Sequence, residues 1–465
     1  MKFKINFLIT GLVLSYLPEF LNINEKLDYN AKIVLSMTIL MIFFWLTETL
    51  PNSVTAFIPI IASPFLLDIE LKQVLYKYSS PVVFLLLGGF ILALGFEKSN
   101  LHQRIAIKSI ILFGKTKKRL LLCCVFSTAF FSMWLSNTAT CLLMLPIIKF
   151  LVDSSIEKGD GFFPKILILS IAYSSSIGGM ITPIGTIPNA ILISFLNENY
   201  NYKINFVDWV YFIFPLALLI LICLYIYFSL LIKNNQKIEQ KKILKKYEML
   251  GKLSLKEKVS GFIIGSTALL WITKSYLNEI LKINLTDSGI AIMCSMLFFI
   301  VPTNKNLNVI LGYEWFRKIP WNILILFGGG LSMAFLIVES GLANKISESM
   351  IFLKDFKIIL LIFLLTLFTS IITEFTSNTA TTFLLLPIFA AFATDLNINI
   401  IIIVLPIVLA ASCAFMMPIS TPPNAIVYSA NKFQMEFMLK IGVVMNLISV
   451  VIITIYMQLF GQLTF

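Results

Sequence analysis

Long apolar segments separated by short polar stretches make up most of the chain. A helix needs about 20 apolar residues to cross roughly 30 Å of hydrocarbon, and eleven segments approach that length. They are 5–22, 31–50, 52–67, 79–97, 165–196, 208–232, 259–280, 286–302, 321–338, 398–430 and 436–460. Two further apolar stretches, 121–152 and 358–394, contain polar residues in the middle, and each is too short for two crossings and too long for one. We therefore predict an all-α polytopic membrane protein with about 11 transmembrane helices and two re-entrant hairpins.

Lysine and arginine are concentrated in two polar segments, 98–119 and 233–258. If each hairpin returns to the side from which it enters, both segments lie on one face, together with Lys2, Lys4 and Lys432. Because basic residues mark cytoplasmic loops, the N-terminus is expected in the cytoplasm and the C-terminus on the opposite side. The same segments are expected to contact anionic lipid.

The composition excludes several classes of protein. The chain is 58% apolar and only 13% charged, whereas soluble domains are nearer half apolar and about a quarter charged, so a soluble enzyme is excluded. The net charge of +12 lies in segments without an aromatic platform, which argues against nucleic-acid binding. A single histidine, His102, and six cysteines without ligand spacing give no basis for a resident metal site.

The two halves of the chain repeat one set of motifs in the same order. The matched pairs are LGGF at 87–90 with FGGG at 327–330, SNTAT at 136–140 with SNTAT at 377–381, and TPIGTIPNAI at 182–191 with MPISTPPNAI at 417–426. The copies begin on spans separated by an odd number of crossings, so they are expected to have opposite orientations. Inverted repeats with interrupted helices are typical of secondary transporters.

Each repeat predicts two interruptions at membrane depth, one at the SNT hairpin tip and one at the Pro-Asn loop. Proline breaks the hydrogen-bond ladder, so the loops before Asn189 and Asn424 each divide a helix into halves. The Ser-Asn pairs are good N-caps for the apolar runs that follow them. Free N–H groups at four helix ends can bind an anion, while carbonyl, hydroxyl and amide oxygens suit a small, hard cation.

The central parts of the hairpins, around the SNT tips, contain no fixed positive charge, because neither 120–148 nor 358–400 includes a lysine or arginine. A dianion bound there must be balanced by helix dipoles and bound cations, which favours cation-coupled symport. The alternative is that the motifs only cap and kink packed helices. The presence of two matched copies in inverted halves argues against this alternative and for a transporter. Glu48 and Glu374 are expected to be buried acids, with either a functional or a structural hydrogen-bonding role.

Taken together, the motifs resemble those of the divalent anion/sodium symporter family, the di- and tricarboxylate transporters. The resemblance extends over nearly the whole chain and includes WLTETLP at 45–51 and LGFEKSNLHQRIA at 94–106. It implies a homodimeric, elevator-type transporter of the bacterial inner membrane, with Na⁺ as the co-transported ion and no organic cofactor.

The resemblance also implies a division into scaffold and transport domains. Scaffold helices and an interfacial arm are expected at 1–118, and the first hairpin and broken helix of the transport domain at 119–232. A cytoplasmic basic segment at 233–258 precedes further scaffold helices at 259–355. The second hairpin and broken helix of the transport domain follow at 356–465.

Site residues are implied in the same way. A first sodium site would use Ser132, Ser136, Asn137 and the Gly185 backbone. A second would use Thr373, Thr376, Asn378 and the Ser420 backbone. The substrate would lie between the tips, in contact with Asn137, Thr138, Thr186, Ser377, Asn378, Thr379, Thr421 and Pro422. Ile187 departs from the family, which often has proline there, so the shape of the first loop stays open.

The expected function is sodium-coupled import of a C4-dicarboxylate such as succinate, fumarate or malate. Within transport, the alternatives are sodium-independent dicarboxylate exchange and symport of citrate or sulfate. A membrane-embedded hydrolase is disfavoured, because the chain has neither an H-E-x-x-H nor a G-x-S-x-G motif.

Overall fold

The computed structural model describes residues 2–20, 27–67, 69–155, 161–233, 235–304 and 307–463. Within these ranges the chain is helical and forms no strand, apart from an isolated bridge between Thr116 and Lys237. This confirms the all-α prediction. Apolar helices long enough to cross a membrane confirm a multi-pass membrane protein.

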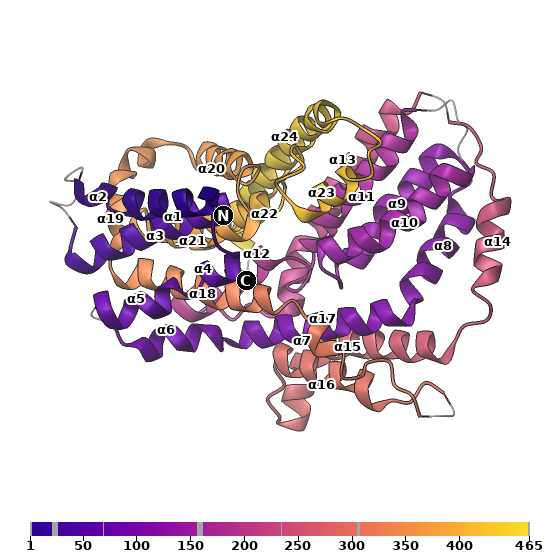
Figure 1. Cartoon of the computed structure of the whole chain (residues 1–465), viewed down its shortest axis with the longest axis horizontal. Coiled ribbons are helices and arrows are strands. Elements are labelled where there is room, and N and C mark those ends of the chain that lie inside the picture. The colour runs from indigo at the N-terminus through magenta and orange to yellow at the C-terminus, as the bar shows by residue number, and fades with distance from the viewer. Residues whose placement is uncertain are drawn as a thin grey trace.

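The helices fall into two matching series joined by a connector (Figure 1). The first series is α1 (Lys2–Ser15), α2 (Leu17–Phe20), α3 (Tyr29–Thr47), α4 (Asn52–Thr55), α5 (Ile58–Leu66), α6 (Leu71–Tyr78), α7 (Pro81–Ser99), α8 (Leu101–Phe113), α9 (Lys117–Ser132), α10 (Asn137–Ser155), α11 (Phe163–Gly179), α12 (Ile187–Asn199) and α13 (Phe206–Leu231). The connector contains α14 (Lys241–Met249). The second series is α15 (Leu255–Leu281), α16 (Asp287–Ile300), α17 (Trp315–Lys318), α18 (Trp321–Glu339), α19 (Leu342–Ser349), the 3₁₀ helix η2 (Ile351–Asp355), α20 (Ile358–Ile372), α21 (Asn378–Asp395), α22 (Ile400–Ala411), α23 (Pro422–Tyr428), α24 (Met435–Phe460) and the 3₁₀ helix η3 (Gly461–Leu463).

The predicted spans differ in how closely they match these helices. Five match helical segments that are long and apolar enough to cross a membrane: 31–50, 79–97, 208–232, 321–338 and 436–460. Three are divided, because 52–67 forms α4 and α5, 165–196 forms α11 and α12, and 398–430 forms α22 and α23. The spans at 259–280 and 286–302 correspond to α15 and α16. The first span, 5–22, corresponds to α1 and α2, and its last two residues lie outside the described residues.

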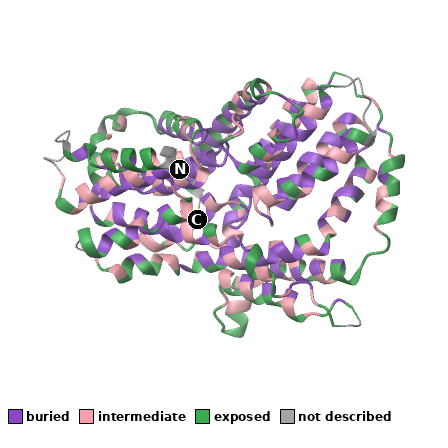
Figure 2. Ribbon diagram, in the orientation of Figure 1, coloured by how far each residue is buried: buried purple, intermediate pink, exposed green. Residues whose placement is uncertain are grey.

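Each predicted hairpin consists of two helices joined by a short turn at the SNT motif. A third helix packs against both arms, since α11 contacts α9 and α10, and α22 contacts α20 and α21. These third helices are almost completely buried (Figure 2). A helix that is apolar on every side is suited to a protein interior or to lipid, and the run of isoleucines in α22 is accommodated in the interior, where every residue of the helix from Ile401 to Ala411 is buried.

The two repeats are interlocked at their broken helices. The second half of the first broken helix, α12, packs on α21 and α22. The second half of the other broken helix, α23, packs on α10 and α11. Each broken helix therefore connects its own hairpin to the hairpin of the other repeat.

The predicted interfacial arm forms α8, which is attached to the connector by Arg104. The guanidinium Nε donates to Glu257 Oε1 at 2.6 Å, and Nη1 donates to the Gly251 carbonyl at 2.9 Å. Because Arg104 and Glu257 are both buried, a charge-assisted pair holds the arm to the first turn of α15, directly after the connector.

One predicted buried acid is wrong. Glu48 is exposed, because α3 ends at Thr47 and Glu48 follows in the left-handed conformation, with φ of 48°. Its position in an apolar stretch suggested burial, but the chain turns away from the helix at that residue.

Candidate functional site

The first hairpin tip is closed by a hydroxyl–amide pair. Ser132, the last residue of α9, is fully buried, and its Oγ lies 2.8 Å from Asn137 Oδ1, where it donates. The same hydroxyl lies 2.7 Å from the Ser175 carbonyl oxygen on α11. Ser136 caps α10, with its Oγ accepting from the Ala139 N–H at 3.3 Å. The capping predicted from the sequence is therefore present at this tip.

The first helix break is organised by Asn189, which is fully buried. Its Nδ2 donates to the carbonyl oxygens of Gly179 (3.1 Å), Met180 (3.0 Å) and Thr182 (2.8 Å). These carbonyls lie at and just beyond the end of α11, where the helix leaves its last acceptors unpaired. One amide group thus contacts three carbonyl oxygens at the break, and it adds to the donors that Met180 and Thr182 receive from Trp209 Nε1 and the Gly185 N–H.

The break and the tip approach each other so closely that only glycine fits between them. A Cβ atom at Gly179 would overlap Asn137 Oδ1. A Cβ atom at Gly185 would overlap the Gly179 carbonyl oxygen and lie 2.8 Å from the Ser132 carbonyl oxygen. Oxygens of Ser132, Asn137 and Gly179, from three separate segments, therefore lie close together where the tip meets the break. Oxygen ligands of this kind are what unwound helices offer to Na⁺ in transporters.

Of the four residues expected at the first sodium site, the structure brings Ser132, Asn137 and Gly185 together. Ser136 lies in the same turn, with its hydroxyl engaged in capping α10. Gly179 was not predicted, although the adjacent glycines at 178 and 179, directly before the Pro-Asn loop, were a signal for it.

The second tip reproduces the first with threonine in place of serine. Thr373 Oγ1 lies 2.8 Å from Asn378 Oδ1 and 2.8 Å from the Ala411 carbonyl oxygen. Ser377 caps α21, since its Oγ accepts from the Ala380 N–H at 3.2 Å. Thr376 is directed elsewhere, because its hydroxyl pairs with that of Thr381. The structure thus unites Thr373 with Asn378 and leaves Thr376 outside this pair.

The second break repeats the amide arrangement around Asn424. Its Nδ2 donates to the Ala414 carbonyl (2.9 Å), the Met417 carbonyl (3.1 Å) and Ser420 Oγ (3.0 Å). Thr421 caps α23, with Oγ1 accepting from the Asn424 N–H at 3.3 Å. Ser420, the expected fourth member of the second sodium site, is therefore held in the loop by Asn424.

Several of the expected substrate contacts are threonines at helix starts. Thr138 and Thr379 are the second residues of α10 and α21, and no described residue shares a hydrogen bond with either hydroxyl. Thr186 and Thr421 directly precede α12 and α23. Pro422, another expected substrate contact, is exposed. The free hydroxyls of Thr138 and Thr379, at the starts of their helices, are suited to bind a carboxylate, whereas the Thr421 hydroxyl is engaged in capping α23.

A carboxylate holds the second break in place. Glu374 is fully buried, and its Oε1 accepts from the Phe415 N–H (2.7 Å), the Met416 N–H (2.9 Å) and Asn446 Nδ2 (2.7 Å). Its Oε2 accepts from the Met417 N–H at 3.0 Å. The burial predicted for Glu374 is confirmed, and its contacts show a hydrogen-bonding role at the break.

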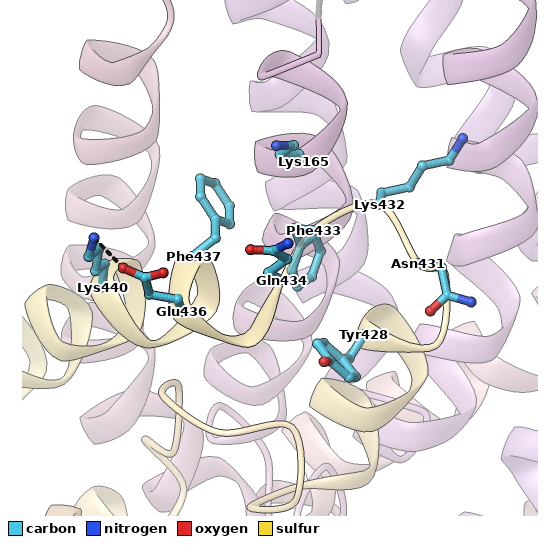
Figure 3. Close-up of a pocket in the computed structure, with 9 residues that line it drawn as sticks. All are labelled: Lys165, Tyr428, Asn431, Lys432, Phe433, Gln434, Glu436, Phe437 and Lys440. Carbon is cyan, nitrogen blue, oxygen red and sulfur yellow. Dashed lines mark ion pairs between the residues drawn. The ribbon is translucent and has the colours of Figure 1, made fainter.

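A cavity of about 670 Å³ opens at the far end of α23, where the chain passes into α24 (Figure 3). Lysines 165, 432 and 440 lie around it, and Lys440 pairs with Glu436 at 2.7 Å. None of the residues expected to bind substrate lines this cavity. It is therefore a separate feature from the two tips.

Comparison with known proteins gives a consistent result. The model of a family described as the sodium:sulfate symporter transmembrane region matches residues 4–465. A sodium-dependent dicarboxylate transporter, SdcS, from Staphylococcus saprophyticus is 34% identical in an alignment 464 residues long that covers 96% of this chain and 89% of the relative. SdcS from Staphylococcus aureus is 36% identical in an alignment 450 residues long that covers 92% of this chain and 86% of the relative.

Two solved structures are similar in fold. The YdaH transporter of Alcanivorax borkumensis has a TM-score of 0.59 at 12% identity, over 84% of this chain and 88% of that chain. MtrF of Neisseria gonorrhoeae, described among antimetabolite efflux pumps, has a TM-score of 0.60 at 11% identity, over 97% of each chain. At such low identity these likenesses bear on the fold alone.

Proposed function

The chain belongs to the family of the sodium:sulfate symporter transmembrane region, and we propose that it imports C4-dicarboxylates such as succinate, fumarate and malate together with sodium. Its family and its named relatives are transporters, so the chain is a transporter and not an enzyme. The observation that supports the proposal best is the matched pair of oxygen-lined hairpin tips, each facing a helix break.

Sodium coupling follows from the balance of charge at the tips. The hairpins contain no lysine or arginine between 120 and 148 or between 358 and 400. A dicarboxylate bound between the tips would accept hydrogen bonds from the hydroxyls of Thr138 and Thr379. Its carboxylates would lie at the N-terminal ends of α10 and α21. Because a helix end supplies only about half a charge, the ends of α10 and α21 together balance about half of a dianion, and in this proposal bound sodium ions supply the remainder. For the same reason, the citrate trianion should bind less well than the succinate dianion.

We propose that transport proceeds by an elevator movement in a homodimer in the bacterial inner membrane, with the N-terminus in the cytoplasm. In this proposal the moving unit contains the two hairpins and the two broken helices, which interlock as described above. The scaffold would comprise 1–118 and 259–355, and the basic connector 233–258 would lie on the cytoplasmic face, in contact with anionic lipid.

The function is tested by uptake of radiolabelled succinate into proteoliposomes. Uptake should require sodium outside and should fail in potassium, and unlabelled succinate should compete better than citrate or sulfate at equal concentration. A sodium-independent exchanger would instead take up succinate in potassium whenever dicarboxylate is present inside. Preference for citrate or sulfate would contradict the proposed substrate class.

The substrate assignment predicts a selective effect of Thr379→Val. Loss of a hydroxyl that donates to a carboxylate should raise the succinate KM about tenfold, while the half-saturating sodium concentration stays nearly constant, because Thr379 is not an assigned sodium ligand. Thr366→Val is a matched control, since this buried hydroxyl bonds only within α20, to the Ile362 carbonyl. An unchanged KM in Thr379→Val would remove this residue from the substrate site.

The elevator proposal predicts that fixing α12 to α7 stops transport. Ser80, which precedes α7, and Ser194 on α12 lie with their hydroxyl oxygens 3.0 Å apart. The Glu198 carboxylate on α12 accepts hydrogen bonds from both hydroxyls, and the Lys77 ammonium lies 2.7 Å from the same carboxylate. Since α7 belongs to the proposed scaffold and α12 to the moving unit, these contacts must break during each cycle.

The measurement uses Ser80→Cys combined with Ser194→Cys. Oxidation should lower uptake in proportion to the cross-linked fraction, and a reductant should restore it. The two single-cysteine variants control for oxidation elsewhere, including the natural cysteines. Full uptake by the cross-linked protein would show that α12 does not move relative to α7.

A further inference from the structure

We propose that Glu374 is a positioning residue that makes the two sodium sites unequal. In this proposal its carboxylate fixes the loop of the second break and places a negative charge beside the second site, which the first site lacks. The second site then binds sodium more tightly and fills at lower sodium concentration. The proposal rests on the sodium-coupled function proposed above and extends it to the order in which the ions bind.

The carboxylate lies in a ring of donors. Three consecutive backbone N–H groups, at Phe415, Met416 and Met417, donate to it, together with Asn446 Nδ2 from α24. Consecutive N–H groups that converge in this way form an anion-binding nest. A protonated carboxyl would need an acceptor for its own hydrogen, and all four partners are donors, so the geometry favours the ionised form.

Hydrogen bonds connect this carboxylate to the second sodium site from two directions. Glu374 directly follows Thr373, whose hydroxyl contacts Asn378 Oδ1 at the tip. On the loop side, Met417 donates its N–H to Glu374 Oε2, and its carbonyl accepts from Ser420 Oγ at 2.7 Å. Removing the carboxylate would therefore take this acceptor away from three backbone N–H groups, of which, among the described residues, only that of Phe415 has a second acceptor, Asn446 Oδ1 at 3.2 Å, and would release the loop that carries Ser420.

The first repeat has no equivalent charge. The SNT motifs are offset by 241 residues, 136 matching 377, and the same offset pairs Glu374 with Met133. The Met133 carbonyl accepts from Thr182 Oγ1 at 2.6 Å, and Trp209 Nε1 donates to the Met180 carbonyl at 3.0 Å. Neutral groups thus perform at the first break the task that a carboxylate performs at the second.

The difference in charge has a consequence for ion binding. A fixed carboxylate in a water-poor interior attracts a nearby cation much more strongly than it would in water. Sodium at the second site therefore benefits from this attraction, and sodium at the first site depends on neutral oxygens alone. Occupation of the second site also fixes Asn378, which is an expected substrate contact, so the first ion prepares half of the dicarboxylate site.

The decisive variant is Glu374→Gln. We expect the half-saturating sodium concentration for succinate uptake to rise about tenfold or more, while the succinate KM at saturating sodium changes less than about threefold. Asn446→Leu is the matched control, because it removes one donor from the same carboxylate and leaves the charge in place. It should shift the sodium dependence less than about threefold. Equal shifts in both variants would reduce Glu374 to a packing role and overturn the proposal.

A second variant, Glu374→Asp, tests the proposal even if Glu374→Gln does not fold. Glu374→Asp keeps the charge, so its half-saturating sodium concentration should stay within about threefold of the natural value, and a tenfold increase would contradict the proposal.

Sodium-dependent thermal stabilisation, measured without dicarboxylate, separates the inference about Glu374 from the proposed transport function. If the natural protein does not transport succinate but sodium stabilises it, and Glu374→Gln weakens that effect, the inference stands and the proposed function fails. If sodium has no effect on the natural protein, the inference fails.

Discussion

Sodium-dependent succinate uptake should fall about a hundredfold in Asn137→Ala and in Asn378→Ala, because each change removes from a hairpin tip an amide oxygen that is an expected sodium ligand. In the structure Ser132 and Thr373 donate to these two amide oxygens, each at 2.8 Å. Alanine has no side-chain oxygen and cannot replace that ligand, although the Ser132 and Thr373 hydroxyls keep the carbonyl oxygens of Ser175 and Ala411 as partners.

The measurement is initial uptake into proteoliposomes, with the folded state checked by size-exclusion chromatography in detergent. Asn278→Ala is a suitable control, since Asn278 also bonds backbone groups, at Leu285, but belongs to the α15–α16 turn, in the proposed scaffold. Its uptake should remain near the natural value. Sodium-dependent uptake that persists in either tip variant would show that the tips are not the sodium sites.

Gly185→Ala should be as damaging as loss of a tip asparagine, for a steric reason. The new methyl group would overlap the Gly179 carbonyl oxygen and lie 2.8 Å from the Ser132 carbonyl oxygen. Both neighbours are backbone atoms and cannot move aside as a flexible side chain would. Overpacking of this kind usually costs about 1–3 kcal/mol, and here the methyl group also occupies the space that a sodium ion needs. We expect uptake to fall about a hundredfold.

Gly265→Ala provides the control for this substitution. A Cβ atom at Gly265, within α15, meets no described heavy atom within 4 Å, so alanine should be tolerated there. Because alanine favours helix over glycine by about 1 kcal/mol, the folded protein should be no less stable. Normal sodium-dependent uptake in Gly185→Ala would mean that no cation binds between the tip and the break.

The sequence predicted those parts of the site that lie close together along the chain. The caps at Ser136 and Ser377 depend on residues within about one helical turn, and the motifs specify them directly. The resemblance to the symporter family implied that Ser132 lies with Asn137 and Thr373 with Asn378, and these residues are also close along the chain. The burial of Glu374 followed from its apolar surroundings in the same way.

Other parts depend on how separate segments meet. Gly179 contacts Asn137 only because α11 packs between the arms of the hairpin, which no local pattern specifies. The Thr376 hydroxyl pairs with the Thr381 hydroxyl and not with Asn378 Oδ1, because the turn between α20 and α21 directs it away from the Thr373–Asn378 pair. The span predicted at 52–67 divides because a turn separates α4 from α5, and Pro59 lies in the first turn of α5. Hydrophobicity alone could not indicate that division.

The interlocking of the two repeats has a consequence for biosynthesis. Helix α12 packs on α21 and α22, which leave the ribosome long after α12 has entered the membrane. Until then, the nascent first half carries a broken helix whose partners do not yet exist, and its polar backbone groups face lipid or an incomplete interior. Chains truncated near the connector should therefore be recognised by membrane quality-control proteases. By the same logic, two half-chains produced separately would mature only when both are present in one cell.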